Sequence, residues 1–339
     1  MALANAAPIP AIDVPAMTSA ADIIVVGRAA GVAFRNALSE TFSVSVDRAL
    51  KGAAQNPPTA VSVRLDVSRP EFQSVIQRQY GIFFLRRTVV GEYTAVDPSH
   101  AVLVASPDKA AKPTGPTDLL GSVTRELAQV FVTPPAILTS PPTGIQSRVV
   151  GEPTVQLQQI YLAAAEAIRS IPYWASAGEI RRIAESGQVV ARLWSLDCLF
   201  FMGDAAEIEA LKLNYLIAVK SILLHPQPDL VPTAWNLANS MEGHLKSPDA
   251  VPTLAELLTS TEVAVRRASA SVLSDIATKA TIAPLAKALN DPDRNVRYYA
   301  VLGLATATES PEAPAMEQFE HKEAEFLGHW RNWAKSNAP

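Results

Sequence analysis

The sequence predicts a multidomain α+β protein in which a small antiparallel β-barrel is followed by an α-solenoid of helical hairpins. Three observations support this fold class. Between Ala21 and Ser106, apolar residues alternate with polar ones, which is the pattern of strands that bury one face. From Thr154 onward, the apolar residues instead recur at helical spacing. Part of this helical half also repeats itself at a fixed interval, and tandem hairpins stack because one hairpin cannot bury its apolar stripe alone.

The repeat covers residues 249–307 and consists of two lines that superpose at one offset. Each line contains two short helical patterns, which a polar turn at 259–262 or at 290–293 divides. The period is shorter than the ~40–47 residues of large helical repeats, which favours a compact hairpin. The aligned apolar pairs, each 31 residues apart, are Val251 with Ile282, Leu254 with Leu285, Leu258 with Leu289, Val265 with Val296, and Leu273 with Leu304.

The turn Asp291–Asp293 is followed by Val296 and Arg297, and Val265 and Arg266 stand at the same place one repeat earlier. This motif, with the small residues that follow it, resembles the HEAT-like repeat of phycobilin lyases. In that family the valine faces the core, and the arginine bonds an acidic residue near the neighbouring turn. The resemblance therefore implies structural roles for Arg266, Arg297 and Asp291.

The first half of the chain predicts five or six mainly antiparallel strands. A small closed barrel or a sandwich accommodates this number without leaving bare edges. Residues 69–79 are expected to form either a short helix or an irregular crossing loop. The expected strands cover residues 22–27, 42–46, 61–67, 80–85, 89–96 and 101–105.

The order of three of these segments carries a second resemblance. The strand Asp22–Gly27, the motif Phe42–Gly52 and the strand Tyr80–Leu85 together resemble the N-terminal β domain of exported bacterial proteins, which is similar to the OB-like barrel of netrin and tissue-inhibitor modules. The tissue inhibitors direct an N-terminal cysteine at a metalloprotease zinc. The single cysteine of this sequence is Cys198, so the resemblance implies the OB-like fold and not protease inhibition.

These patterns divide the chain into four parts. We expect a tail at residues 1–20, a β-barrel domain at 21–106, a proline-rich linker with one helix at 107–153, and a HEAT-like α-solenoid at 154–339. All five tryptophans lie in the last part. The expected helices cover residues 119–131, 157–168, 177–186, 188–202, 205–224 (one or two helices) and 230–245, then the two repeats and a closing helix at 317–335.

Charge and composition exclude several classes of function. The net charge is −4, and residues 249–307 carry six Lys and Arg against six Asp and Glu. Nucleic-acid binding needs a clustered basic face, so no nucleic-acid partner is expected. No apolar run approaches the ~18–20 residues that span a bilayer. Ala4-Asn5-Ala6 resembles the end of a secretory signal, which predicts an exported protein, periplasmic or extracellular, whose signal has been removed. A flexible tail is the alternative.

No catalytic or metal site stands out in the sequence. His321, Glu325 and His329 share one helix face, but residues i and i+8 lie about 12 Å apart along the axis, which is too far for one ion. The sequence has no phosphate-binding loop, dinucleotide fingerprint or nucleophile elbow. Cys198 lies in an apolar run, where a buried small hydrophobe is expected. We therefore expect no catalytic residues, no metal and no cofactor.

The leading hypothesis is a non-enzymatic scaffold that binds a protein partner on the concave face of the solenoid. Residues between the core stripes of the second helices are expected there, and they are Arg267, Ser271, Tyr298 and Leu302. Tyr298 and Leu302 are four residues apart and so neighbours on a helix. A rival interpretation is that the closing helix covers these two residues. The alternative functions are a chromophore-lyase-like enzyme and an adhesive module that binds through the β domain.

The proline-rich segment 133–153 is expected to be the first site of limited proteolysis, because exposed extended chain is the usual place of nicking. Two fragments should survive, one rich in β-structure and one helical by circular dichroism. Cleavage at equal rates along the whole chain, or resistance at this segment, would show that the segment is packed.

Overall fold

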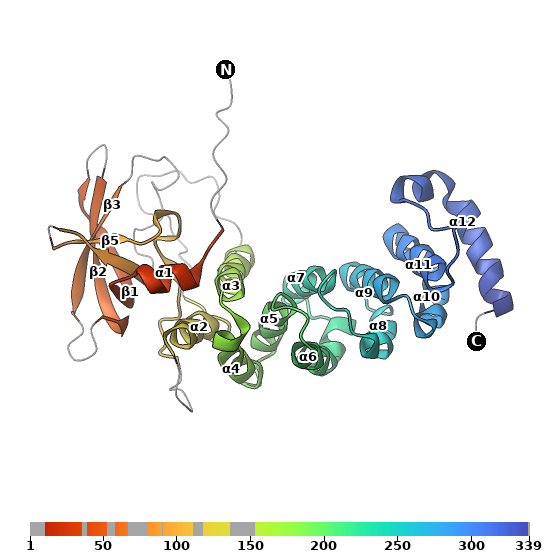
Figure 1. The fold of residues 1–339 in the computed structure, drawn as a ribbon, viewed down its shortest axis with the longest axis horizontal. Coiled ribbons are helices and arrows are strands. Elements are labelled where there is room, and N and C mark those ends of the chain that lie inside the picture. The colour runs from red at the N-terminus through yellow and green to blue at the C-terminus, as the bar shows by residue number, and fades with distance from the viewer. Residues whose placement is uncertain are drawn as a thin grey trace, which may run out of the picture. The chain divides into compact units, whose positions relative to one another are not determined.

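The structure is a computed structural model that describes residues 11–35, 39–52, 58–66, 80–89, 91–110, 118–135 and 153–337. The chain divides into two compact units, Met1–Ser186 and Gly187–Pro339 (Figure 1). The expectations for residues 1–10, for 69–79 and for most of the two proline-rich segments (111–117 and 136–152) lie outside the described residues.

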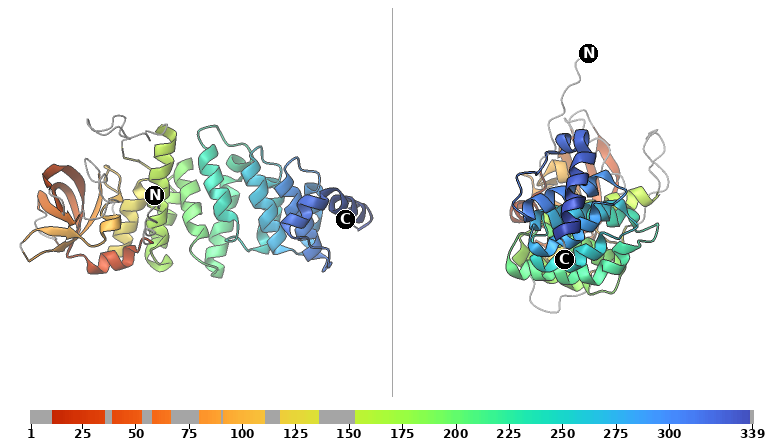
Figure 2. Two further views of the ribbon diagram at one scale, coloured as in Figure 1. Left: turned by 90° about the horizontal axis from the view of Figure 1, so that it is seen from above. Right: turned by 90° about the vertical axis from the view of Figure 1, so that its right-hand side faces the viewer.

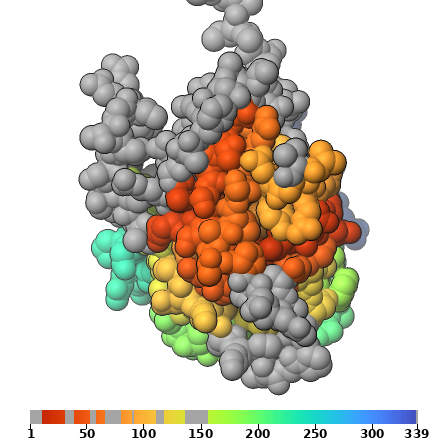
Figure 3. Space-filling view, turned by 90° about the vertical axis from the view of Figure 1, so that its left-hand side faces the viewer, coloured from red at the N-terminus to blue at the C-terminus, as the bar shows by residue number. Residues whose placement is uncertain are grey.

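A closed five-stranded barrel forms the first part of the N-terminal unit. Its strands pair in the ring order β1-β2-β3-β5-β4, and β4 returns to β1. Every pairing in the ring is antiparallel except that of β3 with β5. This confirms the small barrel of the predicted fold class; Figure 3 shows the face that these strands present. The strands are β1 (Ile23–Arg35), β2 (Ser39–Lys51), β3 (Ala60–Asp66), β4 (Tyr80–Arg87), β5 (Tyr93–Ala95) and β6 (Leu103–Val104), the last of which pairs with β4.

The barrel core is made by the alternation that the sequence shows. Phe42, Val44, Val61 and Val63 are almost fully buried in one cluster. Strands β1 and β4 are apolar without alternation because both of their faces are buried, as Ile24 and Val25 show at 0% exposure. The pairing of β1 with β2 shifts register at several points, and such bulges bend a strand enough to close a barrel.

Residues 14–20 correct the expectation of a tail at 1–20. They form helix α1 (Val14–Ala20), whose buried Val14 and Met17 face the unit and whose residues contact β4 and α2. Asp13 caps the helix, and its carboxylate accepts a hydrogen bond from the Ala16 N–H at 2.9 Å. Pro15 is compatible with a first helical turn, so the alanine- and proline-rich composition conceals a helix.

Helices α2 (Leu119–Gln129), α3 (Pro153–Arg169) and α4 (Tyr173–Ala184) belong to the same unit. Arg48 on β2 joins the barrel to α2: its Nε donates to Glu126 Oε1 at 2.9 Å, and it also donates to the Tyr80 hydroxyl and the Ser106 carbonyl. Burial, with a smaller opposing effect of Arg48, raises the pKa of Tyr80 to about 12. The predicted solenoid begins at residue 154, whereas the boundary between the compact units lies after Ser186.

The C-terminal unit is a stack of helical hairpins. Helices α6, α8 and α10 form the first layer, and α7, α9 and α11 form the second, in which α7 contacts α9 and α9 contacts α11 (Figures 1 and 2). Helix α5 precedes them and contacts α6 and α7. The bounds are α5 (Val189–Phe200), α6 (Ala206–Leu224), α7 (Val231–Met241), α8 (Val251–Leu257), α9 (Val263–Ile276), α10 (Ile282–Ala288), α11 (Arg294–Ala307) and α12 (Met316–Asn337).

The two repeats bury equivalent residues. Leu273 and Leu304 are both 0% exposed, as are Val265 and Val296. The helices α9 and α11 approach closely at Gly303, where an added Cβ would lie 2.8 Å from the Ser274 Cα. Only glycine fits this contact without a backbone shift.

Helix α12 closes the stack. It contacts α11 and α10, and its Phe319, Leu327 and Trp330 are buried in the core of the unit. Trp333 packs edge-on against Trp330, with 5.5 Å between the ring centroids. The last repeat would otherwise expose its apolar side, and a distinct capping element is the usual solution in repeat proteins.

Leu273→Ala and Leu304→Ala should each lower the free energy of unfolding by roughly 2–5 kcal/mol, because each removes a fully buried side chain and leaves a cavity. Urea denaturation monitored by circular dichroism measures this. Leu162→Ala, at a residue that is 36% exposed on α3, serves as the control and should cost much less. An unchanged free energy of unfolding in both core variants would show that the assigned register is wrong.

Candidate functional site

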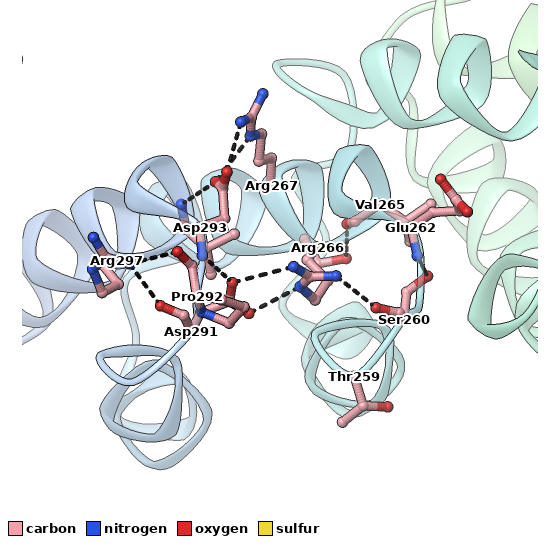
Figure 4. A network of polar contacts seen from close by, with 12 residues as sticks. Thr259, Ser260, Glu262, Val265, Arg266, Arg267, Asp291, Pro292, Asp293 and Arg297 are labelled. Atoms are coloured by element: carbon pink, nitrogen blue, oxygen red, sulfur yellow. Dashed lines mark hydrogen bonds and ion pairs between the residues drawn. The ribbon is translucent and has the colours of Figure 1, made fainter. Parts of the chain in front are cut away.

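An arginine on α9 joins the turn of its own repeat to the turn of the next repeat. Arg266 Nε donates to the Asp291 carboxylate at 2.9 Å, and Arg266 Nη1 donates to the Ser260 carbonyl at 2.9 Å (Figure 4). The side chains of Arg266 and Asp291 are only 15% and 9% exposed. Asp291 also accepts from the Asp293 N–H at 2.8 Å. The fork of the guanidinium thus holds its own turn and the following turn together, as a structural role requires.

The same connection recurs one repeat later. Arg297 Nη1 donates to the carbonyls of Asp291 and Pro292, each at 2.8 Å. Its Nε donates to Glu323 of α12 at 2.7 Å. Glu323 therefore supplies the carboxylate that an aspartate of a further repeat would supply, and the closing helix takes the place of that repeat.

A second set of links lies on the exposed side of the second-layer helices. Arg267 on α9 donates two hydrogen bonds to the Asp293 carboxylate, at 2.9 and 2.6 Å. Trp235 on α7 donates from Nε1 to Glu262 at 3.2 Å. Glu262 and Asp293 are the N-cap residues of α9 and α11. We call the surface formed by Trp235, Glu262, Arg267 and Asp293 the second-helix face.

Asp293 both caps α11 and pairs with Arg267. Its carboxylate accepts from the N–H groups of Asn295 and Val296, at 3.1 and 3.2 Å, and so caps α11. The hydrogen bond from Arg267 lowers the pKa of Asp293, and these two backbone N–H groups lower it further against the opposing effect of burial. The carboxylate is thus held in its ionised form.

The four residues predicted to bind a partner lie in different environments. The Arg267 side chain is 42% exposed, with its guanidinium held by Asp293. Ser271 is buried at 9% exposure. Tyr298 packs edge-on against Phe319 of α12, with 5.5 Å between the ring centroids, as the rival interpretation expects. Leu302 is half-buried on α11. The four residues therefore do not form one exposed patch.

Trp235 was not among the predicted binding residues, although it is 48% exposed on α7. Its neighbours Ala234 and Leu237 are buried. The apolar residues of α7 recur at helical spacing, as they do in the later repeats, and residue 235 lies outside the stripe that they form. This position and the tryptophan itself are the signal from which the sequence could have identified it.

The described part of the chain contains no cluster of three or more His, Cys, Asp or Glu side chains that could hold a metal ion. His329 pairs with Glu312, at 3.2 Å, instead of with Glu325. Cys198 is fully buried. Among the described residues, no helix has the length and apolar composition to span a membrane.

Comparison with known families identifies one similarity. Residues 231–305 match a model of HEAT repeats, and this range covers α7 to α10 and nearly all of α11. The helical repeat that the sequence predicts is thereby confirmed for this part of the chain. No curated protein matches the sequence.

Asp293→Asn should lower the free energy of unfolding near neutral pH. It should also make this free energy depend less on pH in the acidic range, because asparagine retains the cap but not the ion pair with Arg267. The folded-state pKa of Asp293 is depressed. Its contribution is therefore fully present above the unfolded-state pKa and is lost as the pH falls through the folded-state pKa.

Urea denaturation between about pH 7 and about pH 3 measures both effects. Asp249→Asn, at an exposed aspartate of the same unit, is the control and should leave the profile as it is in the wild type. If stability falls equally steeply with decreasing pH in Asp293→Asn and in the wild type, a stabilising role of this carboxylate is contradicted.

Proposed function

We propose that the protein is a non-enzymatic scaffold that binds another protein through the second-helix face of its HEAT repeats. The observation that carries the proposal is the exposure of Trp235. A tryptophan that remains 48% exposed leaves a large apolar surface in water, and its burial by a partner is favourable. Tryptophan and arginine are also the residues that most often dominate binding energy in protein interfaces.

The geometry of the second-helix face supports the same conclusion. The ring of Trp235 is held through Nε1 by Glu262, and Arg267 is held by two hydrogen bonds to Asp293. Side chains fixed before binding lose little conformational entropy when a partner arrives. The face therefore combines an apolar anchor with oriented charges on a rigid stack of helices.

The origin and location of the protein belong to this proposal as well. The turn motif, which resembles that of phycobilin lyases, and the barrel, whose strand order resembles that of netrin-like domains of exported bacterial proteins, support a bacterial scaffold. The Ala4-Asn5-Ala6 segment supports an exported one. A scaffold of this kind acts in the periplasm or outside the cell and needs neither a cofactor nor a nucleic acid.

Site-specific cross-linking tests the proposed face. A photoreactive phenylalanine analogue is placed at position 235, and for comparison at Trp174, which is 72% exposed in the N-terminal unit. Illumination in the producing cell should give a defined cross-linked protein from position 235 and not from position 174. Mass spectrometry identifies the product.

Binding of the identified protein should then weaken by about tenfold or more in Trp235→Ala, and Trp174→Ala should bind as the wild type does. The melting temperature of Trp235→Ala should change little, because the side chain is half exposed. Identical products from both positions, or an affinity that Trp235→Ala leaves unchanged, would exclude the second-helix face as the binding site.

A further inference from the structure

A groove lies between α10 and α12, on the side of the stack formed by the first-layer helices. Its volume is about 660 Å³, within the ~300–1,000 Å³ of typical ligand sites. It continues into a second groove of about 430 Å³ between α8 and α10, which shares Ala283, Lys287 and Asn290 with the first. The lining of the first groove includes Lys287, Arg331, Lys335, Ala283, Ala334 and Asn290.

The charged side chains that line this first groove are all positive. Three cations line it, and none of its lining residues is a carboxylate. Lys287 and Lys335 are exposed and form no ion pair with a described residue. Four other lysines of the unit, Lys212, Lys220, Lys246 and Lys322, are paired with carboxylates. The two groove lysines are thus free to meet an anion.

Arg331 is fixed in place within the groove. Its Nη2 donates to the Leu289 carbonyl at 2.8 Å, which anchors the guanidinium at the end of α10. The Arg331 side chain lines the groove, and the residue is partly exposed. Carboxylate oxygens are the acceptors that guanidinium N–H groups prefer, so Arg331 favours an anionic partner in the groove.

The acidic residues of the helix α12 all lie in its first half. Its first half contains Glu317, Glu320, Glu323 and Glu325, whereas the residues after Phe326 include Arg331 and Lys335 and no acidic residue. Glu323 is engaged by Arg297 and by Arg294 at 3.3 Å. The carboxylates of α12 therefore do not neutralise the cations that line the groove.

We propose that this groove binds an acidic segment of a partner protein in an extended conformation. The carboxylates of the segment meet Lys287, Arg331 and Lys335. Alanine side chains at 283 and 334 leave room for a peptide backbone, and the Asn290 amide both donates and accepts as a peptide group does. Three cations are few for a nucleic acid, whose binding commonly uses 6–10 phosphate contacts.

This site differs from the second-helix face in position and in chemistry. The proposal does not depend on Trp235, which lies on the other layer of helices. The two proposals are tested by different substitutions, so the failure of one leaves the other unaffected.

Fluorescence anisotropy of the full chain with a labelled peptide of alternating glutamate and serine tests the groove. The peptide should bind, and a matched peptide with glutamine in place of glutamate should bind at least about tenfold more weakly. Binding should weaken with added salt, because exposed charges are screened. Lack of binding by the glutamate peptide, or equal binding of both peptides, overturns the proposal.

The double variant Lys287→Glu with Lys335→Glu should weaken binding of the glutamate peptide by about tenfold or more, because like charges then oppose the peptide. Lys109→Glu with Lys279→Glu changes the net charge equally at exposed lysines outside the groove and should bind as the wild type does. Trp235→Ala should also bind normally. An equal loss of affinity in both double variants would mean that peptide binding depends only on the net charge of the protein, and the groove would be excluded as the binding site.

Two further probes separate the class of partner. A single-stranded oligonucleotide and vesicles of anionic lipid are titrated with the same variants. If either probe binds more tightly than the glutamate peptide and loses binding in Lys287→Glu with Lys335→Glu, the groove belongs to a nucleic acid or a membrane surface, and the assignment to an acidic protein segment is overturned.

Discussion

The stacking of the last hairpins depends on one arginine in each of α9 and α11, which bonds an acidic residue of the next element. A guanidinium has five donors in a fixed plane, so Arg266 can satisfy carbonyls of its own turn and the carboxylate of Asp291 together. Lysine has no such fork. A mostly buried ion pair of this kind forms only when the two turns are correctly aligned, so it favours one register between neighbours.

The same constraint explains how the stack ends. A repeat whose arginine found no acidic partner would leave a half-buried charge, which is costly. Glu323 of α12 accepts from Arg297, and the aromatic side chain of Phe319 covers the end of α11 beside Tyr298. The closing helix thus satisfies both the polar and the apolar requirements of a missing repeat. This accounts for the contact that removes Tyr298 from an open surface.

The elements that follow from local patterns could be predicted from the sequence. The barrel strands and the equivalence of Leu273 with Leu304 follow from periodicity, because each residue's face is set by its immediate neighbours. Helix α1 could not be predicted in this way, since it depends on distant contacts such as the hydrogen bond from the Val14 N–H to Ser170. The helix has seven residues, and its buried apolar positions Val14 and Met17 are too few to mark a helical period in an alanine- and proline-rich sequence.

The candidate site was harder to predict, for reasons that lie in the packing of α9 against α11. Gly303 permits a close approach of the two helices, and Ser269, Ser271 and Ser274 on α9 are all buried. A serine is polar enough to be assigned to the surface, yet Ser269 satisfies its hydroxyl within the helix by donating to the Val265 carbonyl at 2.8 Å. Such serines can enter a helix interface without an outside partner.

The surfaces that remain open are therefore those that the stacking interactions do not use. On the second-layer helices, inter-repeat links engage the polar atoms of Trp235 and Arg267 but leave much of both side chains exposed. On the first-layer side, the small residues of α10 leave grooves that the stack does not fill. The arginines that fix the register face the turns and belong to neither surface. A partner can thus bind either layer without breaking the contacts that hold the repeats together.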